Sequence, residues 1–165
     1  MFARHLLALT FTAAIGCGLI AGVFFAFSTF VMPALARLQP HQGMAAMQSI
    51  NITALNPLFM LALFGTAVVC ILLTITLLPK WHQPGTAYLL MGSLLYLVGT
   101  VGVTIAFNVP LNQALAIADP TGTGNASLWA QYWVDWTFWN HVRTVAALAA
   151  AVVFTIALCD RTVQL

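Results

Sequence analysis

The sequence predicts an all-α integral membrane protein: a four-helix bundle formed by a single domain over residues 1–165. Two observations predict this fold class. Hydrophobic residues make up 62% of the chain and charged residues only 5%, which is far outside the range of soluble domains. The hydrophobic residues also gather in four runs, each long enough to cross a bilayer, which takes roughly 20 mainly apolar residues.

The first predicted span continues to about Phe30 without a polar break, so it is too long for the apolar core of a cleaved signal peptide. The second ends at "LPKWHQPG", where Pro79, Pro84 and Gly85 interrupt a helix. Four spans place both chain termini on one side of the membrane. The approximate ranges of the spans are 6–30, 58–78, 86–107 and 138–158.

Basic residues near the span ends predict the orientation. Arg4, Lys80 and Arg161 flank one side of the bundle, whereas Arg37 and Arg143 flank the other. Because basic residues are enriched on the cytoplasmic side, the termini are expected in the cytoplasm. The expected location is the bacterial inner membrane, with the two longer connections on the outer side.

Both longer connections are expected to contain a short helix that lies at the membrane interface. Met44, Met47 and Ile50, in the connection between the first two spans, repeat at helical spacing and form one apolar face. The connection between the last two spans begins with "NVPLNQALAIA", where Pro110 suits the start of a helix.

Small residues form a stripe along the first span. Ala14, Gly18, Gly22 and Ala26 recur at every fourth position, so they share one face of a helix. Such a face allows a neighbouring helix to approach closely. The neighbour is expected either within the bundle or in a second copy of the chain, which would make a homo-oligomer.

The fourth span opens with the polar stretch "TFWNHVRT", Thr137 to Thr144. At about 100° per residue, Asn140 and Thr144 lie at the centre of a polar face, with His141 and Arg143 at its two edges. Tryptophans precede this face at alternating spacings of four and three residues. If one helix runs through the region, they form a stripe that leads into the polar face: Trp129, Trp133 and Trp136.

Other segments carry polar residues at the same, outer end of the bundle. Ser28 lies near the end of the first span. Because four packed spans bring these side chains together with the polar face of the fourth, we expect a polar chamber in the outer half, beneath an aromatic rim. The other polar residues expected in the chamber are Gln48, Asn51, Asn108 and Asn112.

The composition excludes several functions. Only eight side chains carry a formal charge, so no basic surface is available to bind nucleic acid. No Ser, His and acid arrangement and no glycine-rich phosphate loop is evident. Only His41, Asp135 and His141 are available as metal ligands at the outer end, so no metal site and no cofactor is predicted. A metal or haem protein remains an alternative interpretation.

A histidine beside amide and guanidinium donors suits the removal of an acidic proton from an aromatic substrate, because the donors stabilise the anion that forms. A resonance-stabilised carbanion can then react with O₂ without a cofactor. His141 is the predicted base, and Arg143 and Asn140 are the predicted anion stabilisers. The predicted substrate-binding residues are Asn108, Asn112, Gln48 and Asn51, with Trp136 and Trp139 as stacking walls.

At these residues the sequence resembles the anthrone oxygenase family of small four-helix membrane proteins. The matching stretches are "GVFFAFSTFVMPAL", "MQSIN", "FNVPLN" and "WNHVRT", and the resemblance covers nearly the whole chain. The family includes enzymes that convert anthrones to anthraquinones. The resemblance therefore implies an oxidoreductase, whose partners would be an apolar aromatic, anthrone-like or quinol-like substrate, O₂ and the lipid bilayer.

Two alternatives remain open from the residues themselves. The Asn, His and Arg side chains suit a non-catalytic hydrogen-bond network that holds four helices together. A small-molecule transporter is the other alternative, although the chain shows no internal repeat of the kind found in many transporters.

Overall fold

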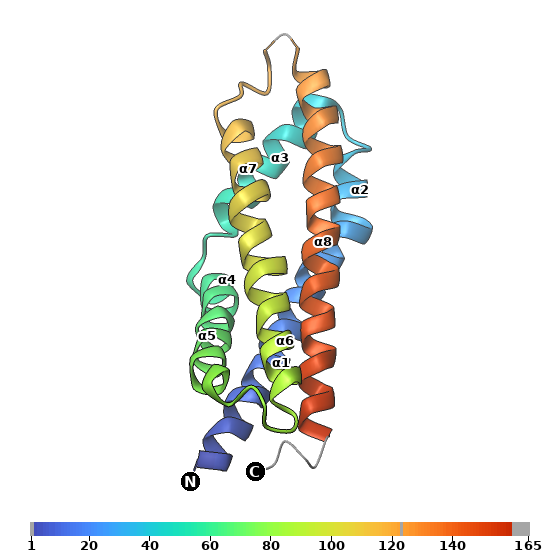
Figure 1. Ribbon diagram of the computed structural model, residues 1–165. Coiled ribbons are helices and arrows are strands. Elements are labelled where there is room, and N and C mark those ends of the chain that lie inside the picture. Colours follow the sequence, from blue (N-terminus) through green and yellow to red (C-terminus); the bar gives the residue numbers. More distant parts are fainter. Residues whose placement is uncertain (1, 123, 160–165) are drawn as a thin grey trace.

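The computed structural model describes residues 2–122 and 124–159, and the regular elements in these ranges are all helical. Four long helices dominate the fold (Figure 1). They are built from shorter segments that follow one another without a break. The first comprises α1 (Phe2–Ala26), η1 (Phe27–Val31) and α2 (Met32–Leu35); the second α4 (Pro57–Met60), η2 (Leu61–Gly65), α5 (Thr66–Leu77) and η3 (Leu78–Lys80); the third α6 (Thr86–Leu94), η4 (Leu95–Gly102), η5 (Thr104–Asn108) and α7 (Val109–Ala116); and the fourth α8 (Asn125–Cys159).

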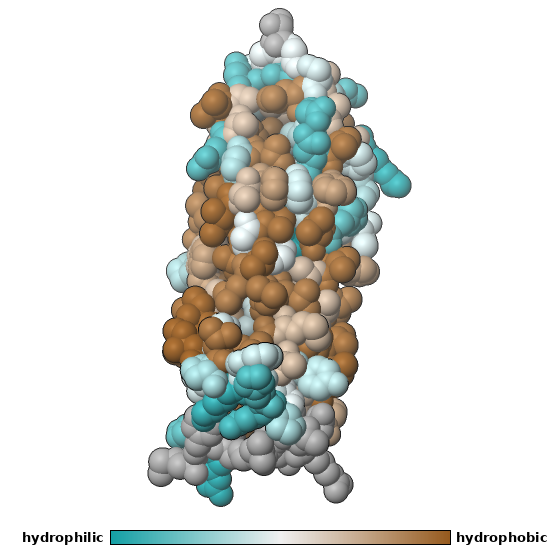
Figure 2. Space-filling view, in the orientation of Figure 1, coloured by the Kyte–Doolittle hydropathy of each residue, from teal (hydrophilic) through white to brown (hydrophobic). Residues whose placement is uncertain are grey.

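Each of the four helices is long and apolar enough to cross a membrane, so the predicted fold class is confirmed and the chain is an integral membrane protein. Figure 2 shows a surface suited to a bilayer: hydrophobic side chains cover the middle of the visible face, and polar side chains gather toward its two ends. We call the end at which α1 begins and α8 ends the terminal end, and the opposite end the loop end (Figure 1).

The helices extend further toward the loop end than the sequence predicted. The third helix continues from Thr86 to Ala116, past its predicted end near Phe107, and α8 begins at Asn125. The tryptophan stripe and "WNHVRT" therefore share one continuous helix. At 1.5 Å per residue α8 is about 52 Å long, whereas the hydrocarbon core of a bilayer is about 30 Å thick.

The two connections differ from each other. The first contains a separate helix, α3 (Pro40–Thr53), as predicted, and its Met44 and Met47 are fully buried. In the second, the described residues between the long helices are 117–122 and 124, because most of the residues expected to form a separate short helix belong to α7, which continues the third helix. The placement of α3 at a membrane interface stays a prediction.

Two π-helical turns lie close to the polar residues, and each ends two positions before a proline. Segment η1 precedes Pro33, and η5 precedes Pro110. A proline ring clashes with the carbonyl group four residues earlier, so a widened turn at this place has a local cause. Ser28 and Asn108 are the buried residues of these two turns.

Two buried clusters fill the bundle. The larger one, toward the terminal end, joins α1, the second helix, the third helix and α8, and includes Tyr96 and Phe154, both fully buried. The smaller one lies beneath α3 at the loop end. Its buried members are Met32, Leu35, Met44, Met47, Leu115, Trp129, Tyr132 and Trp136.

The two glycines of the small-residue stripe do not pack against another helix of the bundle. Gly18 and Gly22 are exposed, and a methyl group added to either would meet no other atom within 4 Å. At these two glycines the expectation of an internal packing groove is wrong, because they lie on the outer face of α1, whereas Ala14 and Ala26 of the same stripe are partly buried. Contact with a second copy stays a prediction. The close approaches between helices occur at other glycines, among them Gly99, where an added Cβ would lie 2.6 Å from the Cβ of Ala146.

This difference between glycines predicts a difference in stability. Gly99→Ala is expected to lower the thermal stability of the protein in detergent, because overpacking a tight contact costs about 1–3 kcal/mol. Gly18→Ala is the matched control: it adds the same methyl group on an open helix face and should leave the unfolding temperature unchanged or slightly higher. Equal unfolding temperatures for the two variants would contradict the close contact between the third helix and α8.

Candidate functional site

Asn140 lies at the centre of the polar cluster and connects α8 to the first helix. Its side chain is fully buried. The amide nitrogen donates to the carbonyl oxygen of Phe24 at 2.7 Å and to Oγ of Ser28 at 2.8 Å. Its amide oxygen accepts from Nη2 of Arg143 at 2.7 Å. Asn140 thus holds two helices together and also fixes the position of Arg143.

Arg143 is the buried cation of the cluster, with only 4% of its surface exposed. In addition to Asn140, its Nη1 donates to Oγ1 of Thr104 on the third helix at 3.2 Å. Two aromatic rings enclose the guanidinium: Cζ lies 4.1 Å from the ring centroid of Phe24 and 5.2 Å from that of Trp136. All the protein partners of this cation are therefore neutral among the described residues.

The guanidinium also has donors to spare. It carries five N–H groups, yet its hydrogen bonds to Asn140 and Thr104 use two of them, and the buried Nε has no partner. An unpaired charge inside a protein or a membrane is costly, by roughly 2.5–3.5 kcal/mol on insertion scales at the centre of a span. The arrangement is thus electrostatically incomplete, and an anion would complete it.

The depth of Arg143 follows from its position in α8. It precedes Cys159 by 16 residues, so it lies about 24 Å from the terminal end of the helix. The hydrocarbon core is about 30 Å thick. If the terminal end marks one boundary, Arg143 lies within the core, in the half nearer the loop end, as the sequence predicted for the polar residues.

Asn108, on the third helix, belongs to the same buried region. Its amide nitrogen donates to the carbonyl oxygen of Trp136 at 3.2 Å, and its amide oxygen is buried without a partner. The hydroxyl of Thr137, which is also buried, lacks a partner as well. Unpaired donors and acceptors therefore lie on both sides of the contact between the third helix and α8.

The other three predicted polar residues lie nearer the loop end, and the side chains of two of them form hydrogen bonds within the protein. Asn112 accepts from the hydroxyl of Tyr132 at 2.9 Å and from Nε1 of Trp136 at 2.8 Å. Gln48 of α3 donates to the carbonyl oxygens of Leu115 and Ala118 at 2.8 and 2.9 Å, and so caps the end of α7. These contacts identify Asn112 and Gln48 as residues that hold helices in place.

Asn51 differs from these two, because its buried amide nitrogen has no partner. The two predicted stacking residues also take different positions. Trp136 is buried beside Arg143, whereas Trp139 is half-buried at the surface, where its ring stacks on Phe107 with centroids 3.5 Å apart. Only Trp136 therefore lines the polar cluster directly.

His141 lies outside the cluster. Its side chain is exposed, between Phe138 and Val145 on the outward-facing stripe of α8, and contacts no polar group among the described residues. The predicted polar face was too broad: Asn140 lies near the centre of the buried face, and His141 is about 100° away from it. The expectation that His141 borders the chamber is therefore wrong, and its role as base has no geometric support.

Thr104 and Phe24 contact Arg143 directly, and neither was predicted from the sequence. A threonine and a phenylalanine within apolar spans are too common to attract attention. For Thr104 one signal was present, because Thr100, Thr104 and Asn108 recur at every fourth residue and thus share a helix face. Nothing in the sequence singles out Phe24.

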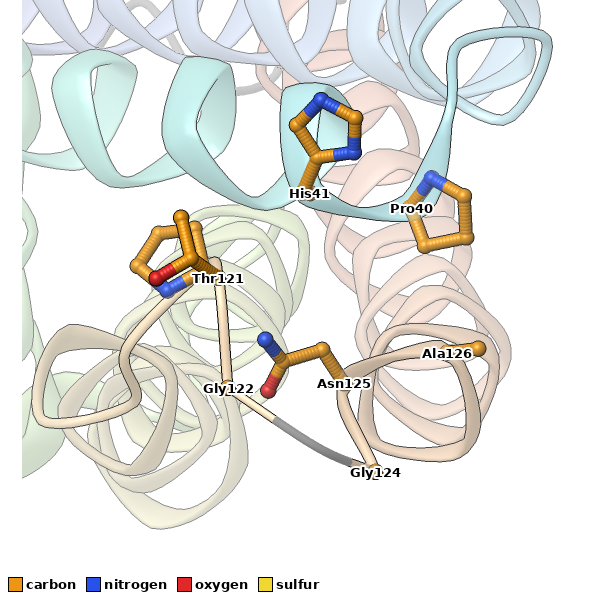
Figure 3. Close-up of a pocket in the computed structure, with 8 residues that line it drawn as sticks. Pro40, His41, Thr121, Gly122, Gly124, Asn125 and Ala126 are labelled. Carbon is orange, nitrogen blue, oxygen red and sulfur yellow. The ribbon is translucent and has the colours of Figure 1, made fainter.

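A separate open cleft of about 500 Å³ lies at the loop end. Figure 3 shows His41 at the start of α3 on one side and the turn before α8 on the other. In this turn the backbone N–H and the hydroxyl of Thr121 both donate to Asp119 at 2.8 Å, which lowers the pKa of that exposed carboxyl group. None of the predicted site residues lines the cleft, whose lining comprises Pro40, His41, Pro120, Thr121, Gly122, Gly124, Asn125 and Ala126.

Metal ligands do not gather in the described ranges, where no three His, Cys, Asp or Glu side chains come close enough to share an ion. His41 borders the cleft, His141 faces outward, and Asp135 accepts a hydrogen bond from Gln131 at 2.6 Å. The absence of a cofactor stays a prediction.

Comparison with known proteins establishes the family. The family described as anthrone oxygenase matches residues 58–153, which is more than half of the chain. The chain belongs to the anthrone oxygenase family. The predicted family is thereby confirmed over residues 58–153, whereas the stretches "GVFFAFSTFVMPAL" and "MQSIN" lie before the matched range. Searches of curated proteins and of solved structures found no match.

The residues matched to the anthrone oxygenase family include most of the polar cluster. Thr104, Asn108, Asn140 and Arg143 all lie within residues 58–153. Phe24 and Ser28 of the first helix, which complete the cluster in the structure, lie before the matched range. The family's name points to oxygenase chemistry.

Proposed function

We propose that this anthrone oxygenase family member oxidises a flat, apolar aromatic substrate within the membrane, and that Arg143 binds the anionic form of the substrate. The single observation that carries the proposal is the buried guanidinium with an unpaired Nε and no anionic partner among the described residues. Its hydrogen-bond partners, Asn140 and Thr104, are neutral and leave its charge available to a ligand.

The proposed reaction converts a methylene group between two aromatic rings into a ketone. The substrate loses one C–H proton, and the carbanion, which is delocalised onto an oxygen atom, binds at Arg143. The carbanion gives electrons to O₂ and forms a C–O bond; after protonation, the resulting hydroperoxide loses water and leaves the ketone. One substrate and one O₂ thus yield one ketone and one water, so the reaction requires no reductant and no cofactor.

Arg143 makes the deprotonation favourable without a neighbouring base. A positive charge about 4 Å from the developing oxyanion contributes on the order of 4 kcal/mol at an effective dielectric constant of about 20. Opposite charges at this distance favour ionisation of the acid. We assign no side-chain base to this step, since His141 is exposed on the outward face of α8, and the proton passes to water.

The experiment uses the purified protein in lipid nanodiscs with anthrone as the test substrate. Anthraquinone formation is followed by absorbance and O₂ consumption with an electrode. We expect oxidation above the rate of nanodiscs that carry the Arg143→Gln variant, with one O₂ consumed per anthraquinone. Equal rates for the wild type and for Arg143→Gln would overturn the proposal.

His141→Ala provides a second prediction, because the exposed imidazole contacts nothing in the cluster. Turnover should change by no more than about 0.5 kcal/mol, or roughly twofold in rate, as for an ordinary surface substitution. Val145→Ala, on the same outward-facing stripe, is the matched control. A loss of turnover in His141→Ala alone would restore His141 as the base.

The structural alternative also has an observation in its favour. Asn140 bonds to Phe24, Ser28 and Arg143, and so contributes to stability whatever the protein catalyses. This role explains Asn140 but not Arg143, because a neutral side chain would hold the helices together without the cost of a buried charge. The two interpretations make opposite predictions for Arg143→Gln.

A further inference from the structure

The third helix and α8 run antiparallel, side by side (Figure 1). Three contacts between them follow one another toward the loop end. The first is the hydrogen bond from Arg143 to Thr104, the second is the stack of Trp139 on Phe107, and the third is the hydrogen bond from Asn108 to the carbonyl group of Trp136. The two stacked rings therefore lie at the level of the polar cluster, between its two hydrogen bonds across the helix contact.

The stacked rings face outward, whereas the polar groups at the same level face inward. Phe107 is 38% exposed and Trp139 is half-buried, but Asn108 and Arg143 are 1% and 4% exposed. In α8, Trp139 lies one helical turn before Arg143. A molecule that approaches from the lipid between these two helices thus meets the two rings before it meets the guanidinium.

The geometry of the ring pair is unusual. The ring planes of Phe107 and Trp139 are inclined by 7° and their centroids are 3.5 Å apart, so the rings lie almost directly over one another. Aromatic pairs generally prefer offset or edge-to-face arrangements with centroids about 4.5–7 Å apart. A flat aromatic molecule in an offset stack on one ring provides an equivalent or better contact, so the pair can be exchanged for a stack with a ligand at little cost.

From this arrangement we propose that Phe107 and Trp139 form an aromatic gate: the flat apolar substrate enters laterally from the bilayer between the third helix and α8, stacks on these rings, and reaches Arg143. The inference rests on the proposed function for the identity of the substrate. It adds the route of entry and two residues that select for planar rings. Because the rings do not contact the guanidinium, they determine access to the site and affinity for the substrate.

The test closes the gate reversibly. In a Cys159→Ser background, which removes the exposed thiol, the double variant Phe107→Cys/Trp139→Cys is crosslinked with a short bis-methanethiosulfonate and released with dithiothreitol. Binding is measured in nanodiscs by the fluorescence of anthracene-2-carboxylate, a flat anion, and turnover is measured with anthrone. The two single-cysteine variants, treated identically, are the controls.

We expect the crosslink to slow both probe binding and anthrone oxidation, and dithiothreitol to restore both. Unchanged binding and turnover in the crosslinked protein would overturn the gate while leaving the proposed function intact. If the crosslink slows binding of the probe but the protein does not oxidise anthrone, the gate is supported and the proposed function is overturned.

Single substitutions test the selection of planar substrates. Trp139→Ala should raise KM roughly two- to tenfold, the range that one stacking contact supplies, with little change in kcat. Trp139→Phe retains a ring and should restore most of the affinity. A parallel loss of kcat in Trp139→Ala with unchanged KM would instead place Trp139 in the chemical step and contradict a role in entry.

Discussion

Arg143→Gln is expected to reduce anthrone oxidation by about 10²–10³-fold, because removal of one preorganised donor to an oxyanion costs this much in well-studied enzymes. The variant should nevertheless remain folded. Glutamine can still donate to the amide oxygen of Asn140, which Arg143 now bonds at 2.7 Å, and the substitution removes a buried charge that has no anionic partner among the described residues. Turnover in nanodiscs and thermal unfolding in detergent are measured on the same preparation.

Arg143→Lys is the matched control, since it retains the positive charge but loses the planar arrangement of donors. It should keep part of the activity that Arg143→Gln loses. The structural interpretation predicts a different pattern, in which both variants lower the unfolding temperature and no ligand restores it. A large loss of stability in Arg143→Gln, with turnover per folded molecule unchanged, would support that interpretation.

Sequence patterns were sufficient for the fold class because the membrane imposes a simple rule. Backbone groups within lipid must be bonded internally, so long apolar runs become helices. The ends of the helices are harder to predict, because polar residues such as Asn108 and Asn112 are also typical of the boundary of a span. The third helix continues past them to Ala116, and the backbone and side chains of α8 provide their hydrogen-bond partners.

The polar cluster was predictable in outline but not in detail. Asn140, Arg143 and Ser28 do come together, as helical geometry and the packing of four spans predicted. Helical geometry alone cannot tell which part of a polar face is buried, and for this reason His141 was assigned to the chamber. The inward direction of α8 is set by its contacts with the first and third helices, which depend on the tertiary packing.

The same limitation explains the small-residue stripe of α1. Its spacing is suitable for a close helix contact, and Gly18 and Gly22 do share a face, yet this face is directed outward. The tight internal contacts occur instead at glycines without a repeating spacing, such as Gly43 against Trp129 and Gly92 against Phe154. A motif shows that close packing is allowed, and only the packed structure shows where it occurs.

Thr104→Asp should eliminate turnover without removing Arg143, because it neutralises the guanidinium. The hydroxyl of Thr104 accepts from Nη1 of Arg143 at 3.2 Å, so a carboxylate at this position would pair with the guanidinium. A fixed carboxylate would then neutralise the guanidinium that binds the anionic substrate, and turnover should fall to the level of Arg143→Gln. The protein should remain folded, because a buried ion pair with both partners present is tolerated.

Thr104→Asn is the matched control, because it has the same shape as aspartate and no charge. It should keep most of the wild-type rate, so the comparison isolates the effect of neutralising Arg143. The double variant Thr104→Asp/Arg143→Gln extends the test: it leaves a buried carboxylate without its cation, which costs about 3–5 kcal/mol, and should unfold at a lower temperature than either single variant. If Thr104→Asp and Thr104→Asn oxidise anthrone equally fast, the free charge of Arg143 is not what drives the reaction.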